Sequence, residues 1–154
     1  MADYISEFKR LIQKASFALG KEIDADKYEI VDLGIPHIPQ SLPDGKMGIY
    51  TFLYKDKDQF LKIGKAGPKS GARFLSQHYN PKSAKSTLAA SLIRDNDMKK
   101  FELNEVNVKK WIKDNCRRID IIMDEELGSF TLELVEAILH YFYKPKYEGY
   151  NSQQ

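Results

Sequence analysis

Four side chains of different chemistry are candidates for work on a phosphate ester: Tyr50, Lys62, Arg73 and Glu136. Cleavage of a phosphodiester requires a positioned nucleophile and stabilisation of the negative charge in the transition state. A tyrosine beside a cation can help to activate water, because a positive charge favours the phenolate. An arginine binds phosphate oxygens through its planar guanidinium, and a carboxylate supplies an oxygen ligand to Mg²⁺ or Mn²⁺.

Each candidate also has an ordinary structural role, and the sequence leaves both roles open. Tyr50 is either a core aromatic or an active-site phenol. Lys62 is either a strand lysine that points to water or a cation that faces Tyr50 across two strands. Arg73 is either exposed or ion-paired. Glu136 and His140 lie four residues apart, so they either share a site or form an exposed pair on a helix.

The hydrophobic pattern predicts the elements that must hold these residues. Apolar residues at helical spacing predict a helix over 3–19 that stops at Gly20. Two β-rich runs at 49–54 and 60–63, separated by a charged turn, predict the antiparallel hairpin that carries Tyr50 and Lys62. A third strand is expected over 118–123.

The remaining segments complete the expected α+β fold. Residues 21–47 predict a loop-rich connection with one short strand or turn at 28–33. Further helices are expected over 70–78 with Ser70 as the cap, over 83–94, over 104–114, and from 127 or 129 to 143. This order predicts a small, mostly antiparallel three-stranded sheet flanked by helices.

The motifs lie in a fixed order along the chain. The hairpin contains Gly48-Ile49-Tyr50 in its first strand and Lys62-Ile63-Gly64 in its second, Arg73 follows, and Glu136 precedes a Lys-Pro-Lys-Tyr run at 144–147. In order and spacing, residues 47–151 resemble the GIY-YIG nuclease superfamily. The resemblance implies a nuclease domain over 47–151 with a helical insertion, preceded by an N-terminal helix and a loop-rich extension over 1–46.

The resemblance also implies roles for single residues. Tyr50 falls on the tyrosine that helps to activate the attacking water, Arg73 on the arginine that contacts the scissile phosphate, and Glu136 on the metal ligand. Lys62 stands where most members have the second-motif tyrosine, and it is expected to assist Tyr50. The positions expected to support these groups or to orient the substrate are Gly48, Gly64, Gln77, His78, His140 and Asn151.

The charge distribution indicates an anionic partner. Residues 62–118 contain fourteen Lys or Arg and five Asp or Glu, so this segment carries +9 and the rest of the chain −7. A local positive field attracts a polyanion, because each neutralised phosphate releases counterions. The lysines expected to contact nucleic acid are Lys65, Lys69, Lys82 and Lys85. The alternative is a set of solvated helix faces on a protein-interaction domain.

These observations lead to one functional expectation and one alternative. We expect a divalent-metal-dependent endonuclease that hydrolyses phosphodiester bonds, with DNA as substrate and Mg²⁺ or Mn²⁺ as cofactor. The alternative is a catalytically inactive nucleic-acid-binding module of the same fold, because Lys62, Gln77 and Glu148 depart from the family pattern. The sequence leaves the oligomeric state open.

Composition excludes several other classes of protein. The chain has 154 residues, of which 42% are hydrophobic and 30% charged, as in a globular protein. No apolar run approaches the length of a membrane span, and the first residues lack the apolar region of a secretory signal, so a cytoplasmic location without membrane contact is expected. The single cysteine, Cys116, excludes a disulfide framework. No role is assigned to His37.

Overall fold

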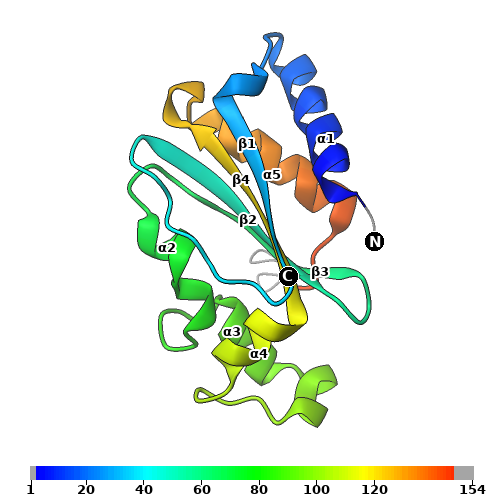
Figure 1. The fold of residues 1–154 in the computed structure, drawn as a ribbon. Coiled ribbons are helices and arrows are strands. Elements are labelled where there is room, and N and C mark those ends of the chain that lie inside the picture. Colours follow the sequence, from blue (N-terminus) through cyan, green and yellow to red (C-terminus); the bar gives the residue numbers. More distant parts are fainter. Residues whose placement is uncertain (1–2, 148–154) are drawn as a thin grey trace.

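The computed structural model describes residues 3–147, which form a four-stranded antiparallel sheet covered by helices on both faces (Figure 1). The strand order is β1-β4-β2-β3, and all three neighbouring pairs are antiparallel. The α+β class is therefore confirmed. The strands are β1 (Tyr28–Gly34), β2 (Lys46–Tyr54), β3 (Gln59–Ala66) and β4 (Cys116–Asp124).

The expected count of three strands is wrong, because residues 28–34 form a full edge strand. β1 pairs with β4 from Tyr28 opposite Met123 to Gly34 opposite Arg118. Asp32 of β1 also forms a salt bridge with Arg117 of β4. The sequence suggested only a short strand or turn, since this run lies next to a loop rich in proline and glycine.

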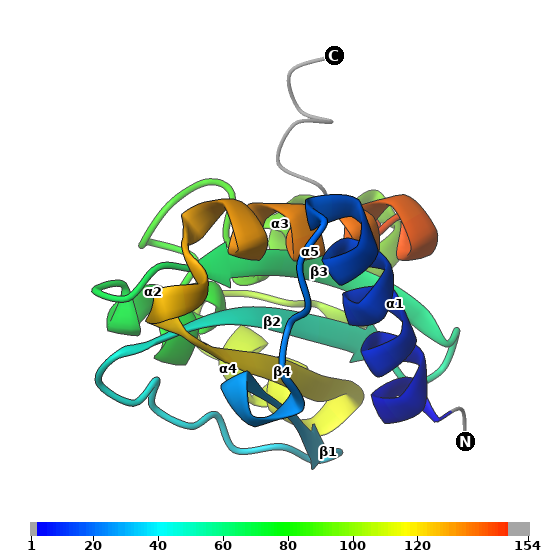
Figure 2. The same cartoon turned by 90° about the horizontal axis from the view of Figure 1, so that it is seen from above.

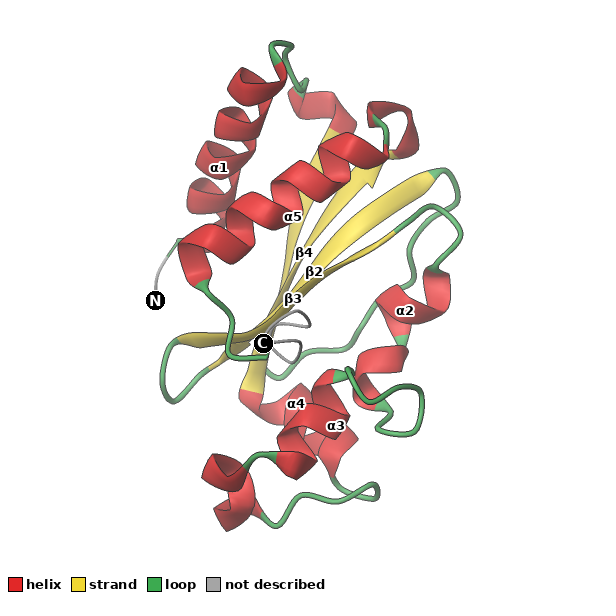
Figure 3. Ribbon diagram, turned by 180° about the vertical axis from the view of Figure 1, so that it is seen from behind, coloured by secondary structure: helices red, strands yellow, loops and turns green. Residues whose placement is uncertain are grey.

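The helices divide between the two faces of the sheet (Figure 3). One face carries α1 and α5, which lie side by side (Figure 2). The other face carries α2, α3 and α4. The helices are α1 (Tyr4–Leu19), α2 (Gly71–Leu75), α3 (Leu88–Arg94), α4 (Val108–Asn115) and α5 (Ser129–Tyr143), with short 3₁₀ turns at Ala25–Lys27, Gln77–Tyr79, Asn96–Phe101 and Glu125–Leu127.

The alternation of side chains along the central strands builds two separate cores. Ile49 and Ile121 point toward α1 and α5, whereas Phe52 points toward α2, α3 and α4. On the first face, Phe8 of α1 packs with Phe60 of β3 at the centre of an aromatic cluster. Successive residues of a strand face opposite sides, so one hairpin sequence supplies both cores.

Two expected helix ends agree with the structure. α1 ends at Leu19, and Gly20 adopts a left-handed conformation with φ of 70°, in which its amide donates to the Phe17 carbonyl. α5 ends at Tyr143, immediately before Lys144 and Pro145.

Three helices are shorter than the sequence pattern predicts. The helix expected over 83–94 begins only at Leu88, because the Thr87 hydroxyl accepts a hydrogen bond from the Ala90 amide and caps it there. The helix expected over 104–114 begins at Val108, after turns held by the side chains of Asn104 and Asn107. The segment expected as one helix over 70–78 forms α2 and a separate 3₁₀ turn.

The outer edge of β3 is partly covered by the chain that follows α5. The amides of Lys146 and Tyr147 donate to the carbonyls of Phe60 and Leu61 at 3.0 and 2.9 Å. Farther along the same edge, His140 Nε2 lies 2.8 Å from the Ile63 carbonyl oxygen. α5 and the chain that follows it therefore cover part of this edge strand. Within residues 3–147, no helix has the length and apolar character needed to cross a bilayer.

Candidate active site

A cavity of about 650 Å³ opens over the β3 edge, and it brings together side chains from both helical layers. Tyr50, Lys62, Arg73 and Glu136 all line it, although 86 residues separate the first from the last. The other lining residues are Ile63, Gly64, Lys65, Gln77, His78, Ala84, Ser86, Thr87, Ala137, His140 and Tyr141. The four candidates for phosphate chemistry therefore share one solvent-connected pocket.

Tyr50 lies opposite Gly64 in the β2–β3 ladder, and its ring covers that glycine. A Cβ atom on Gly64 would lie 2.5 Å from Cζ of Tyr50, so only glycine leaves room for the ring. The expectation that Tyr50 and Lys62 face each other directly is wrong. Lys62 is opposite Phe52, in the same unbroken register that places Tyr50 opposite Gly64, and it reaches the same cavity from a diagonal position.

The phenol of Tyr50 is hydrogen-bonded to His78, with 2.6 Å between Oη and Nε2. Nδ1 of the same ring accepts the Leu88 amide proton at 3.1 Å. In the neutral imidazole the proton must then be on Nε2, so His78 donates to the tyrosine oxygen. The hydroxyl proton of Tyr50 is left for another acceptor.

Burial controls the protonation of both partners. Tyr50 is 4% exposed, and this burial raises the pKa of its phenol, while the positive charge of Arg73 lowers that pKa and the negative charge of Glu136 raises it. Burial also lowers the pKa of His78 to about 3, and the nearby charge of Lys62 adds to this effect. At neutral pH the pair is therefore a neutral phenol and a neutral imidazole.

Lys62 is buried rather than solvated. The residue is 8% exposed, and its Nζ donates a hydrogen bond to the Ser86 carbonyl oxygen at 3.2 Å. Ser86 lies in the turns before α3, so this bond joins β3 to the opposite wall of the cavity. The reading of Lys62 as a strand lysine directed into water is therefore wrong.

Arg73 lies in α2 and is exposed at the cavity wall, while its neighbour Phe74 is buried against the sheet. Gly48 makes this packing possible, because a Cβ there would lie 2.6 Å from Cε2 of Phe74. Ser70 is the residue before the helix, but its side chain forms no capping hydrogen bond. The expected Ser70 cap is therefore wrong, and α2 depends on packing for its position.

Glu136 and His140 reach the cavity from α5, on the other side of β3. The Lys65 ammonium lies 3.4 Å from Oε1 of Glu136, and His140 contacts the Ile63 carbonyl described above. They are therefore not an exposed helix pair, whereas Glu133 on the same helix is exposed.

The cavity offers one carboxylate as a ligand for a magnesium ion. In the part of the chain that the structure describes, no three His, Cys, Asp or Glu side chains are grouped to hold a metal ion. Glu136 is the acidic residue among those that line the cavity. One carboxylate fits a Mg²⁺ or Mn²⁺ ion whose remaining ligands are water and phosphate oxygens. Lys65 would have to yield its contact with Glu136 when such an ion binds.

The other expected site residues are spread more widely. Gln77 lines the cavity and is partly exposed, whereas Lys69, Lys82 and Lys85 are exposed and do not line it. Lys82 is paired with Glu105 at 3.3 Å. Asn151 lies outside the described residues.

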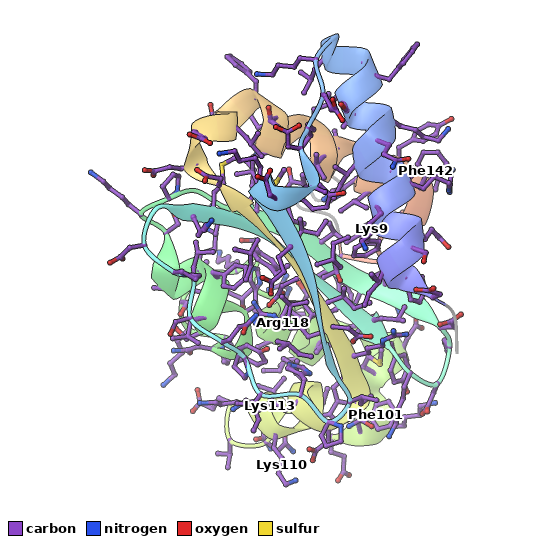
Figure 4. All side chains as sticks on the ribbon, turned by 45° about the horizontal axis from the view of Figure 1, so that its top comes forward. Lys9, Phe101, Lys110, Lys113, Arg118 and Phe142 are labelled. Carbon is purple, nitrogen blue, oxygen red and sulfur yellow. The ribbon has the colours of Figure 1, made fainter. Side chains whose placement is uncertain are left out.

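The basic segment is not one continuous surface. Arg118 is fully buried, and Arg117 is bound to Asp32. Figure 4 shows Arg118 in the interior, whereas Lys110 lies at the periphery. The charge of +9 counted along the sequence therefore overstates the charge available to a polyanion.

Two further residues carry no site assignment from the sequence. Tyr141 lines the cavity and is 73% exposed, although its spacing on α5 did not distinguish it from the packing aromatic Tyr143. His37 is 2% exposed, with Nδ1 2.7 Å from the Cys116 carbonyl oxygen and Nε2 2.7 Å from the Tyr79 hydroxyl. No local signal reveals these partners, which are distant in the sequence.

Comparisons with known proteins add no further assignment. The scan against protein-family models and the searches of curated proteins and solved structures each found no match to this chain. The function must therefore be inferred from the chemistry of the cavity.

Proposed function

We propose that this protein is a divalent-metal-dependent endonuclease of the GIY-YIG type that hydrolyses phosphodiester bonds in DNA. One observation carries the proposal: Tyr50, Arg73 and Glu136 reach the same cavity from β2, α2 and α5. A tyrosine, an arginine and a carboxylate are the groups needed to activate water, bind a phosphate and hold one metal ion.

The cationic side chains that line the cavity would bind the phosphate. The Arg73 guanidinium is exposed and can donate two hydrogen bonds to one phosphate group. Lys62 adds a second positive charge in the lining of the cavity, and its ammonium is held by the bond to the Ser86 carbonyl. These charges oppose the negative charge that develops on the phosphate oxygens as the nucleophile attacks.

Tyr50 is assigned to the attacking water. In its phenolate form Oη takes a proton from the water, and the new oxygen–phosphorus bond forms as the bond to the leaving oxygen breaks. The phenolate is scarce at neutral pH because burial raises the pKa of Tyr50. The Nε2–H donor of His78 and the charge of Arg73 both favour the phenolate, so His78 is assigned to the support of Tyr50.

Glu136 would hold the Mg²⁺ or Mn²⁺ ion, which supplies positive charge beside the scissile phosphate when bound. The carboxylate is partly exposed within the cavity and is already paired with a cation, Lys65. The release of Lys65 from Glu136 would then leave its ammonium available to a phosphate oxygen of the substrate.

A plasmid-nicking assay with Mg²⁺ tests this function. We expect the wild-type protein to nick supercoiled DNA and Arg73→Ala to reduce the rate by about 100-fold or more, the usual cost of losing one transition-state donor. Arg94→Ala is the matched control, because Arg94 is also an exposed helical arginine but does not line the cavity.

The same assay, read with a binding measurement, separates the other classes. Binding of DNA that weakens with salt, without nicking by the wild type, would support the inactive binding module instead. The absence of both binding and nicking at low salt would indicate a protein-interaction domain. Equal nicking by wild type and Arg73→Ala would contradict the assigned phosphate site.

A further inference from the structure

Arg118 of β4 is a charged side chain inside the protein, in the layer between the sheet and α2. It is 0% exposed and is among the largest fully buried side chains (Figure 4). Burying an arginine costs free energy unless its donors are satisfied and its charge is paired. Asp120, two residues later on the same strand face, provides the pairing carboxylate at 2.8 Å from Nε.

The other two arms of the guanidinium reach the segment that carries two of the cavity groups. Nη2 donates to the Phe74 carbonyl oxygen at 2.6 Å, and Nη1 donates to the Tyr79 hydroxyl at 2.9 Å. The guanidinium carbon also lies 5.0 Å from the centre of the Phe74 ring. Phe74 follows Arg73 and Tyr79 follows His78, so Arg118 holds the chain at both ends of this segment.

The direction of each hydrogen bond in this network is determined by the groups themselves. The Cys116 carbonyl can only accept, so Nδ1 of His37 donates to it. Burial lowers the pKa of His37 to about 4, so at neutral pH Nε2 is unprotonated and accepts the Tyr79 hydroxyl proton. The Tyr79 oxygen then accepts from Arg118. These hydrogen bonds join β4 to the loop before β2, which carries His37, and to the turn after α2, which carries Tyr79.

Local structure alone does not hold the segment in place. α2 has five residues, Ser70 does not cap it through its side chain, and a helix this short is not stable by itself. Arg118 satisfies one of its last carbonyls, which would otherwise lack a partner. A lysine retains the charge but lacks the planar fork that reaches three partners at once.

We propose that Arg118 is a positioning residue, which fixes the segment from Arg73 to His78 so that both side chains face the cavity. The structural part of this proposal concerns the protein without substrate. Its catalytic part rests on the proposed nuclease function. Arg118 acts through Phe74 and Tyr79 and does not itself line the cavity.

An NMR titration of the His78 imidazole tests the structural part without any substrate. In the wild-type protein we expect the ring to stay neutral down to about pH 3, the value to which burial lowers its pKa. In Arg118→Lys, which preserves the charge, we expect the pKa of His78 to rise by at least one unit toward the ordinary value, because the loosened segment admits water.

Arg117→Lys is the matched control, since Arg117 is adjacent on β4 but pairs with Asp32 on the opposite side of the strand. We expect this variant to keep the wild-type His78 titration. Tyr79→Phe removes the hydroxyl that links Arg118 to His37, and it provides a second test if Arg118→Lys does not fold. A wild-type His78 titration in a folded Arg118→Lys or Tyr79→Phe protein would overturn the proposal.

Nicking kinetics test the catalytic part. We expect Arg118→Lys to lower kcat by about tenfold or more with KM for DNA changed by less than about twofold, because the arginine acts on the geometry of the reacting groups. An unchanged kcat would overturn this part. If the wild type does not nick DNA, the nuclease function fails, while the His78 titration still decides the role of Arg118.

Discussion

The two faces of the sheet bury different chemistry, although both are covered by helices. Under α1 and α5 the core consists mainly of aliphatic and aromatic side chains, with the ring cluster of Tyr4, Phe8, Phe60 and Tyr143 at one end. The buried charged residue on this side is Arg117, which is paired with Asp32 and lies over the Tyr4 ring. Under α2, α3 and α4 the buried residues include His37, Lys62, His78, Arg118 and Asp120.

This difference indicates that the two layers contribute differently to stability and to the geometry of the cavity. Apolar burial stabilises a fold without specifying the position of any polar atom to within a hydrogen bond. A buried polar network costs desolvation, but it fixes the groups that belong to it. Apart from α5, which brings Glu136 and His140 to the cavity, the first layer therefore contributes mainly stability, while the second holds Tyr50, Arg73 and His78 around the cavity.

The largest expected effect comes from the apolar layer. Phe8 is fully buried, so we expect Phe8→Ala to lower the free energy of unfolding by about 3–5 kcal/mol. Because Phe8 does not contact the cavity, nicking per folded molecule should not change. Chemical denaturation and nicking at a temperature where the variant is folded measure both quantities.

Phe52→Ala provides the corresponding change in the polar layer. Phe52 packs against the Tyr50 ring and lies under the Arg118 guanidinium. We expect the Phe52→Ala protein to lose both folding stability and nicking activity. Equal nicking per folded molecule by the two variants would contradict the division between the layers.

Acid should weaken the polar layer specifically. Burial lowers the pKa of His37 to about 4 and of His78 to about 3, so below about pH 6.5 the unfolded chain binds protons that the folded protein does not. Burial raises the pKa of Asp120 to about 6. Below that pH the folded protein binds one proton at Asp120 that the unfolded chain does not, which offsets part of the loss of stability.

The two histidines outweigh the aspartate between neutral and mildly acid pH. We expect the free energy of unfolding to fall by about 2 kcal/mol from about pH 7 to about pH 5, and His78→Gln to remove most of this loss. Denaturation at the two pH values measures it. A free energy of unfolding that stays constant or rises on acidification would argue against buried, neutral histidines.

A stability change of similar size is expected at Gly64, under the Tyr50 ring. We expect Gly64→Ala to cost about 1–3 kcal/mol and to displace the phenol from His78, because the added Cβ overlaps the ring. Gly71→Ala is the control, since its Cβ meets no atom within 4 Å. Nicking should fall for Gly64→Ala only; the same activity in both variants would show that the position of Tyr50 does not matter.

Local sequence patterns predicted much of the fold. The spacing of apolar residues indicated α1 and α5, and the paired β-rich runs indicated the β2–β3 hairpin, because these signals depend on near neighbours. The length of β1 was underestimated, because β1 is stabilised by hydrogen bonds to β4, which lies far along the chain and leaves no signal in the local pattern. The start of α3 was misplaced because the Thr87 cap decides it.

The same limit explains which parts of the site were foreseen. The motif order identified residues that line the cavity, but it did not give the strand register, which places Tyr50 opposite Gly64 and Lys62 opposite Phe52. Arg118 is paired with Asp120 on its own strand, but its burial also depends on Phe74 and Tyr79 in one distant segment, so its sequence suggested a surface cation. Long-range polar contacts of this kind leave no periodic signal.

If the cavity is a metal-dependent nuclease site, Glu136→Gln and Glu133→Gln should differ in activity. Both glutamates lie on α5, but only Glu136 lines the cavity. We predict that Mg²⁺-dependent plasmid nicking falls by about 100-fold or more in Glu136→Gln and stays at the wild-type rate in Glu133→Gln. Undiminished nicking by purified Glu136→Gln would contradict the account.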